Sequence, residues 1–306
     1  MDNYQAGSPM NETRWTHLSL NGLVAAFAEE GTTISTFTVR YLLHLHGYGL
    51  RKHTKCVTIK QHKDRDAQFK QIIAFRKAGQ EDDKILVLSI DTKKTEREGC
   101  LARAGSVYCQ ATLQVYDHDF KQLETGKLVP YGIYDLKKNY CHLVLGNSAD
   151  TSDFALDAMK DWWDSVKDTY KDIQQIYIFC DGGGSNRAAG YRYKVAVQEL
   201  ANYTQKTIRI CHYPPYCSKY NPIEHQAFPH VTRSLAGVVL DSAQTAKQLI
   251  EQKAKTNKGF MTVVSILDKV YQIGKKVSKE AIAALKISRD EVLGKWNYVI
   301  MPNALE

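Results

Sequence analysis

Two aspartates each end an apolar run that has the composition of a buried strand. Asp91 closes the segment ILVLSID, and Asp181 closes QQIYIFCD. Ligands of α/β sheets bind beyond the carboxyl ends of strands, so the two carboxylates share an edge if their strands are neighbours. Glu224 lies early in the helix expected after the last strand. The sequence therefore places three acids where one edge of a sheet could gather them.

Three converging carboxylates repel one another, and divalent cations relieve that repulsion. Hard oxygen ligands suit Mg²⁺ or Mn²⁺. Two such ions about 4 Å apart activate a water or a 3′-hydroxyl and stabilise the departing oxygen of a phosphodiester. Each acid alone is more simply an ordinary strand-end or helix-start residue. The prediction of a metal site rests on the three together.

The surroundings of these acids are unusual for plain strand ends. Asp181 is followed by three glycines and then SNR, and glycines allow a backbone or a nucleic acid to approach closely. Such a turn could also cradle a nucleotide, but DGGGSNR fits neither GxGxxG nor GxxxxGK(S/T). In the segment NPIE, Asn221 is expected to cap a helix whose exposed first turn holds Pro222 and Glu224.

Strand and helix patterns alternate between residues 85 and 236. Strands are expected at 85–91, 128–135, 140–147, 174–181 and 207–213, and helices at 153–166, 187–203 and 221–235. The order β-β-β-α-β-α-β-α predicts an α/β domain. Residues 96–127 are an insertion between the first two strands, with a strand of its own expected near 111–116.

The N-terminal region, residues 1–60, contains two short helical patterns. Gly31 is expected to end the first helix, and Ser35 to cap the second. Two helices joined by a tight turn are a candidate helix-turn-helix, and the alternative is a plain helical hairpin. Outward-facing side chains and a basic tail favour DNA binding here. The expected contacts are Thr36, Arg40, His44, Arg51 and Lys52.

Composition narrows the class of protein. The chain has 306 residues with a formal net charge of +8, which makes a polyanionic partner plausible. No apolar run approaches the ~18–20 residues that span a membrane, so no membrane association is expected. The seven cysteines are odd in number and lack CxxC spacing, which argues against a disulfide framework and a zinc site. The expected location is the cytoplasm.

Several motifs resemble those of one transposase family. They are SIDTKKTE (89–96), HDF (118–120), PYGIYDL (130–136), DGGGSN (181–186) and HYPPYCSKYNPIEH (212–225), together with the helix-turn-helix region and DRDAQF (64–69). These stretches resemble the ISAzo13-type, or Rhodopirellula-type, DDE transposases, which are related to the IS630/Tc1/mariner group. The resemblance covers about residues 14–235.

This resemblance implies a fold, a site and an activity. It implies an RNase H-like mixed sheet flanked by helices, and a triad of Asp91, Asp181 and Glu224 that binds Mg²⁺ or Mn²⁺, with two ions expected. It implies cutting and joining of DNA at transposon ends in a bacterial, nucleoid-associated setting. Lys93, Lys94, Asn186 and His225 are further candidates for contact with DNA phosphates.

The expected organisation has four parts. They are a helix-turn-helix region at 1–60 that is shorter than in fuller family members, a linker helix at 61–84, the catalytic domain at 85–236 and a helical extension at 237–306. The leading function is a DNA transposase, which could act as a homo-oligomer. The alternatives are another RNase H-like nuclease and a transposase-derived DNA-binding protein without catalysis.

Overall fold

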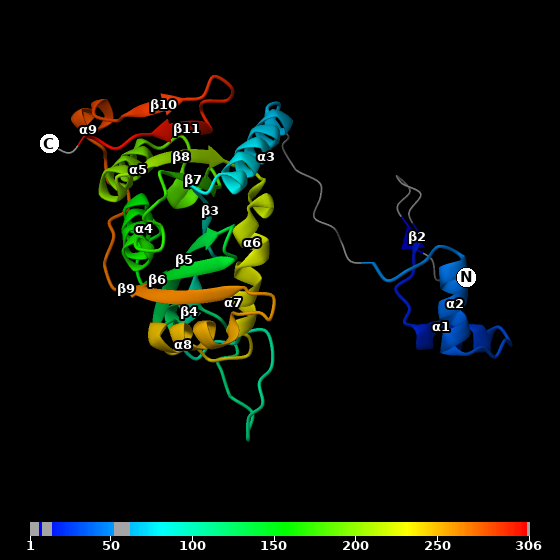
Figure 1. Cartoon of the computed structure of the whole chain (residues 1–306). Helices are drawn as coiled ribbons and strands as arrows, with labels where there is room; N and C mark the ends of the chain where they lie inside the picture. Colours follow the sequence, from blue (N-terminus) through cyan, green and yellow to red (C-terminus); the bar gives the residue numbers. More distant parts are fainter. Residues whose placement is uncertain (1–5, 8–13, 52–61, 305–306) are drawn as a thin grey trace. The chain divides into compact units, whose positions relative to one another are not determined.

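The computed structural model describes residues 6–7, 14–51 and 62–304 (Figure 1). The chain divides into two compact units, an N-terminal unit of residues 1–58 and a C-terminal unit of residues 59–306. No helix in the described part of the chain is long and apolar enough to cross a lipid bilayer.

Two capped helices dominate the N-terminal unit. They are α1 (Leu20–Glu29) and α2 (Thr36–Leu45). Two short strands that precede them in the sequence, β1 (Ala6–Gly7) and β2 (Arg14–Trp15), pair antiparallel with each other. The Ser35 side chain accepts a hydrogen bond from the Thr38 amide at 3.1 Å, which satisfies a free donor at the start of α2. The predicted helix pair is confirmed. Of the expected DNA contacts, Thr36, Arg40, His44 and Arg51 are exposed, and Lys52 lies outside the described residues.

The C-terminal unit is built on one mixed sheet. Its strands run in the order β10-β11-β8-β7-β3-β5-β6-β9, with β4 paired to β5. They are β3 (Ile85–Thr92), β4 (Glu96–Glu98), β5 (Gly126–Asp135), β6 (Tyr140–Gly146), β7 (Gln175–Cys180), β8 (Thr207–His212), β9 (Met261–Leu267), β10 (Ile287–Arg289) and β11 (Asn297–Ile300). The predicted α/β class and the strands predicted between 85 and 213 are confirmed, apart from the one near 111–116.

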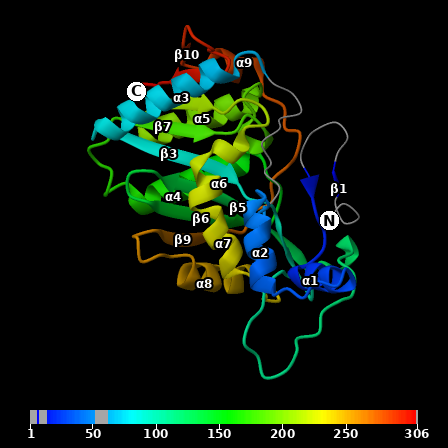
Figure 2. The same cartoon turned by 90° about the vertical axis from the view of Figure 1, so that its right-hand side faces the viewer.

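Helices cover both faces of this sheet (Figure 2). One face packs on α4 (Ser152–Val166) and α5 (Tyr191–Thr204). The other packs on α3 (Arg65–Glu81), α6 (Pro222–Gln226), α7 (Phe228–Ser234) and α8 (Ala243–Lys253). The short helix α9 (Lys279–Ala283) contacts α5. Burial on both faces explains why the central strands are continuous apolar runs rather than alternating ones.

Strand β3 lies at the centre and sets the position of the site. It pairs parallel with β7 and antiparallel with β5. Its even-numbered residues, including Leu88, face the α4 and α5 layer. Side chains alternate along a strand, so Ser89 and Asp91 face the opposite layer, where α6 lies.

Two parts of the expected organisation were wrong. Helix α3 is not a linker, because its buried Gln68 side chain donates to the His212 carbonyl at 2.8 Å and to the Asn297 side chain at 2.9 Å. Residues 237–306 are not mostly helical, since they supply β9, β10 and β11 to both edges of the sheet. The β9 sequence MTVVSIL contains β-branched residues that favour a strand. Its partner β6, however, lies far from it in the sequence, so the pairing could not be predicted locally.

The insertion also differs from its expected structure. No strand forms at 111–116, and only β4 and the 3₁₀ turn η2 (Lys121–Leu123) are regular between 96 and 125. Figure 1 shows most of this segment as a long loop that extends from the sheet. The helix expected at 221–235 is likewise divided, at Ala227, into α6 and α7.

Gly132 on β5 allows α6 and α7 to approach the sheet. A Cβ at this position would lie 2.5 Å from Ile223 Cδ1 and 2.7 Å from Phe228 Cε1. We predict that Gly132→Val lowers the free energy of unfolding by about 1–3 kcal/mol through overpacking. Gly182→Ala is the control, because its Cβ would meet no atom closer than 3.6 Å. Thermal and urea unfolding measure the effect, and equal stability of both variants and the wild type would contradict it.

Candidate active site

Asp91 is a buried acid at the end of β3. Its side chain is only 7% exposed, and one carboxylate oxygen accepts the Thr92 amide at 2.8 Å. Burial and, after it, the charges of Asp181 and Glu224 raise the pKa of Asp91 to about 8. The three predicted acids therefore lie close enough to influence one another, although they are distant in sequence.

Asp181 reaches the same edge because β7 runs parallel to β3. Ser89 pairs with Phe179 in that register, so both strands end together. Burial raises the pKa of Asp181, as do the charges of Asp150 and Glu224, whereas the Gly183 amide and the Asn186 side chain lower it by hydrogen bonding. The glycine-rich turn thus supplies donors to this carboxylate.

Glu224 is positioned by a buried hydrogen-bond network between α6 and β3. The Ser89 hydroxyl donates to Asn221 Oδ1 at 2.5 Å and accepts the Ile223 amide at 3.0 Å. Asn221 Nδ2 donates to the Ile90 carbonyl at 3.0 Å. The Asn221 side chain therefore does not cap α6 as expected; it fixes the helix start to the strand that carries Asp91.

His212 supports Asp181 from the neighbouring strand. It is fully buried, and burial lowers its pKa to about 4, so the ring is neutral near pH 7. Its Nδ1 lies 2.9 Å from the Asp181 carbonyl and its Nε2 lies 3.0 Å from the Tyr298 hydroxyl. A carbonyl can only accept, so Nδ1 carries the proton and donates it. His212 is a positioning residue.

Asp150 is a fourth acid at this edge that sequence reasoning missed. It follows β6, which runs parallel to β3 because β5 lies antiparallel between them. Asp150 Oδ1 accepts the Thr92 hydroxyl at 3.1 Å, and its charge acts on Asp181. The signal available was the one used for the other acids, an aspartate soon after an apolar strand.

The candidate DNA contacts near the triad fall into two groups. Lys94 and His225 are exposed, although the His225 ring bonds to the Lys219 carbonyl. Lys93 is mostly buried and forms an ion pair with Glu96. Asn186 is 1% exposed and bonds to Asp181. Asn186, which was expected to contact a phosphate, is therefore buried against the catalytic candidate Asp181.

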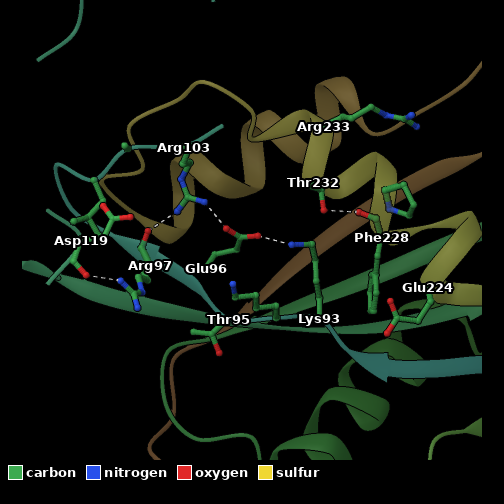
Figure 3. Close-up of a pocket in the computed structure, with 14 residues that line it drawn as sticks. Lys93, Thr95, Glu96, Arg97, Arg103, Asp119, Glu224, Phe228, Thr232 and Arg233 are labelled. Atoms are coloured by element: carbon green, nitrogen blue, oxygen red, sulfur yellow. Dashed lines mark hydrogen bonds and ion pairs between the residues drawn. The ribbon is translucent and has the colours of Figure 1, made fainter. Parts of the chain in front are cut away.

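A pocket of about 990 Å³ adjoins the triad (Figure 3). Glu224 and Phe228 line it at one end, and Arg97 and Arg103 line it on the side of the insertion. Asp91 and Asp181 are not among its lining residues, so it lies beside the three acids rather than around them.

The donor set suits a hard divalent cation. Its groups are carboxylates, and the pKa of Asp91 is raised by burial and by repulsion from Asp181 and Glu224, both of which a bound cation would offset. Within residues 6–7, 14–51 and 62–304, no three acidic, histidine or cysteine side chains already surround one point.

The chain is similar to a known transposase family and to solved transposase structures. The sequence model of a family described as Rhodopirellula transposase DDE domain matches residues 1–302. A Mos1 transposase paired-end complex with left transposon end is 14% identical, with a TM-score of 0.48 over 83% of this chain and 76% of that one. The Mos1 strand transfer complex is 14% identical, with a TM-score of 0.45 over 83% and 76%. None of the curated protein sequences compared with this chain matches it.

Asp91→Asn should stabilise the metal-free protein increasingly as pH rises. The pKa of Asp91 in the folded state, about 8, exceeds the ~3.9 of an unfolded aspartate. Its contribution to stability is complete below pH ~4 and is lost as pH rises through about 8. Asparagine avoids this loss, so the variant's advantage in Tm should grow from pH 5 to pH 8.5 in EDTA. Adding Mn²⁺ should raise the wild-type Tm more than the variant's. A pH-independent difference would contradict the assignment.

Asn221→Ala should remove the anchor of Glu224. It leaves the buried Ser89 hydroxyl without its acceptor and removes the Asn221 donor to the Ile90 carbonyl, which lowers the free energy of unfolding by about 1–3 kcal/mol. Ser89→Ala breaks the same network, so the double variant should lose less than the sum of the single losses. Urea unfolding of all four proteins measures this coupling, and strictly additive losses would argue against the network.

Proposed function

We propose that this chain, which belongs to the Rhodopirellula transposase DDE domain family, cleaves DNA at transposon ends and joins the freed 3′-hydroxyl to target DNA. Asp91, Asp181 and Glu224 are the proposed catalytic acids. The observation that carries the proposal is the buried Asp91 carboxyl, whose pKa is raised by burial and by the other two acids. Acids with perturbed pKa values cluster at functional sites, and three such acids at one sheet edge support a catalytic role.

The proposed cofactor is Mg²⁺ or Mn²⁺, held by these three acids with two ions. When bound, divalent ions activate the attacking water or hydroxyl and stabilise the leaving oxygen of the phosphodiester. The chain's own residues fix the acids beforehand. Asn186 and the Gly183 amide orient Asp181, and Asn221 orients the turn that bears Glu224.

DNA recognition is proposed for the N-terminal unit and for the rim of the site. Thr36, Arg40 and His44 share the exposed side of α2, where they are expected to contact DNA in the way a second helix of a helix-turn-helix does. Lys94 and His225 are exposed beside the triad and are expected to hold phosphates. The phosphate contacts of Lys94 and His225 are expected to position the substrate without reading its sequence, since phosphates carry no sequence information.

Asp181→Asn and Glu224→Gln should abolish cleavage and strand transfer while DNA binding persists. Both changes keep the side-chain shape but remove a charge that the proposed ions require. The substrate is a duplex that carries the inverted repeat flanking the gene, and products are resolved on a sequencing gel. Asp164→Asn is the control, because this acid lies exposed on α4 and bonds to Lys167 and Tyr203. Full activity in either triad variant would refute the assignment, and cleavage without joined product would favour a simple nuclease.

A further inference from the structure

The pocket beside the triad has two walls of different origin. One wall comes from the turn after β3, β4 and the following loop, through Lys94, Arg97 and Arg103. The other comes from α7, through Thr232 and Arg233 (Figure 3). Glu224 alone of the three acids opens into it. A polymer that crosses the triad can therefore continue into this pocket on the Glu224 side.

The pocket is rich in cationic side chains, and they are not equally available. Its basic residues are Lys93, Lys94, Arg97, Arg103 and Arg233, against the acids Glu96, Asp119 and Glu224. Glu96 forms ion pairs with Lys93 and Arg103. Burial raises the pKa of Glu96, but the two positive charges outweigh this effect and the pKa is lowered. This mostly buried trio forms a fixed floor rather than a free binding surface.

The remaining cations are placed to receive a ligand. Lys94 is exposed and makes no ion pair or hydrogen bond within the part of the chain that the structure describes. Arg233 is exposed, and within residues 62–304 its side chain bonds to the His230 ring alone, at 2.9 Å. Arg97 is half exposed and pairs with Glu124 at 3.1 Å. Lys94 and Arg233 thus offer charges from opposite walls that no described carboxylate neutralises.

A pair of glycines holds the two walls together. The Gly237 amide, just after α7, donates to the Ala104 carbonyl at 3.1 Å. A Cβ on Gly105 would lie 2.7 Å from Ala236 Cβ, and both glycines have positive φ, at 116° and 70°. The Gly99 amide also donates to the Leu240 carbonyl at 2.8 Å. The base of the insertion is therefore fixed against the end of α7, and the pocket is preformed.

We propose that this pocket holds the phosphate backbone of the DNA strand on one side of the scissile phosphate, with Lys94 and Arg233 as its main contacts from the two walls. The inference rests on the proposed function and adds the path of the substrate and the role of Arg233. A phosphodiester chain fits because it presents repeated negative charges, whereas Glu224 beside the pocket disfavours a lone anion.

The test compares the double variant Lys94→Gln/Arg233→Gln with the wild type and with Lys171→Gln. Lys171 is exposed at the opposite end of the strands, before β7 begins. The probe is a fluorescent 30-base-pair inverted-repeat duplex with flanking DNA, and anisotropy is measured at several salt concentrations in EDTA. Two lost phosphate contacts should weaken binding and reduce the salt slope by about 2. Lys171→Gln should match the wild type.

Trimmed probes locate the contact. Trimming the duplex on one side of the cleavage position should make the wild type and the double variant bind equally, whereas trimming the other side should preserve their difference. An equal Tm rise with Mn²⁺ in both proteins should show that the variant's carboxylates are intact. A variant that binds every probe like the wild type, or a difference that survives both trims, would overturn the inference. Absence of cleavage by the wild type would instead count against the proposed function.

Discussion

Mutual repulsion among the three carboxylates at one edge of the sheet is the main physical constraint on this fold. In water, free carboxylates such as these would move apart, and burial makes the charged forms of Asp91 and Asp181 less favourable still. The fold holds them together nevertheless. Parallel pairing brings the ends of β3 and β7 to one edge, and α6 adds the third acid from above the sheet.

The forces that hold the acids come from neutral polar groups. The Ser89–Asn221 network joins β3 to α6 with buried hydrogen bonds, and His212 fixes the backbone of Asp181. Gly132 lets α6 and α7 lie close to the sheet. Neutral donors and acceptors can be buried at little cost when they are all paired. They preorganise the acids without forming ion pairs that would compete with a divalent cation.

Much of this arrangement was predictable from local sequence. Apolar runs that end in an acid gave β3 and β7 with Asp91 and Asp181, and the NPIE segment gave Glu224 at a helix start. Contacts between distant segments were not predictable in the same way. Asn221 has the sequence features of a helix cap, but it bonds to Ser89, 132 residues away. Asn186 has the features of an exposed turn residue, but it is buried against Asp181. Strands β9 and β11 pair with β6 and β8 respectively, which lie far from them in the sequence, so their places in the sheet could not be predicted from local patterns.

The central claim is that Asp91 holds a proton that a divalent cation must displace. Calorimetric titration of Mn²⁺ in buffers of different ionisation enthalpy counts the protons released on binding. A pKa of about 8 predicts release of about one proton at pH 7 by the wild type, and much less by Asp91→Asn. Binding of Mn²⁺ to the wild type without proton release would contradict the account.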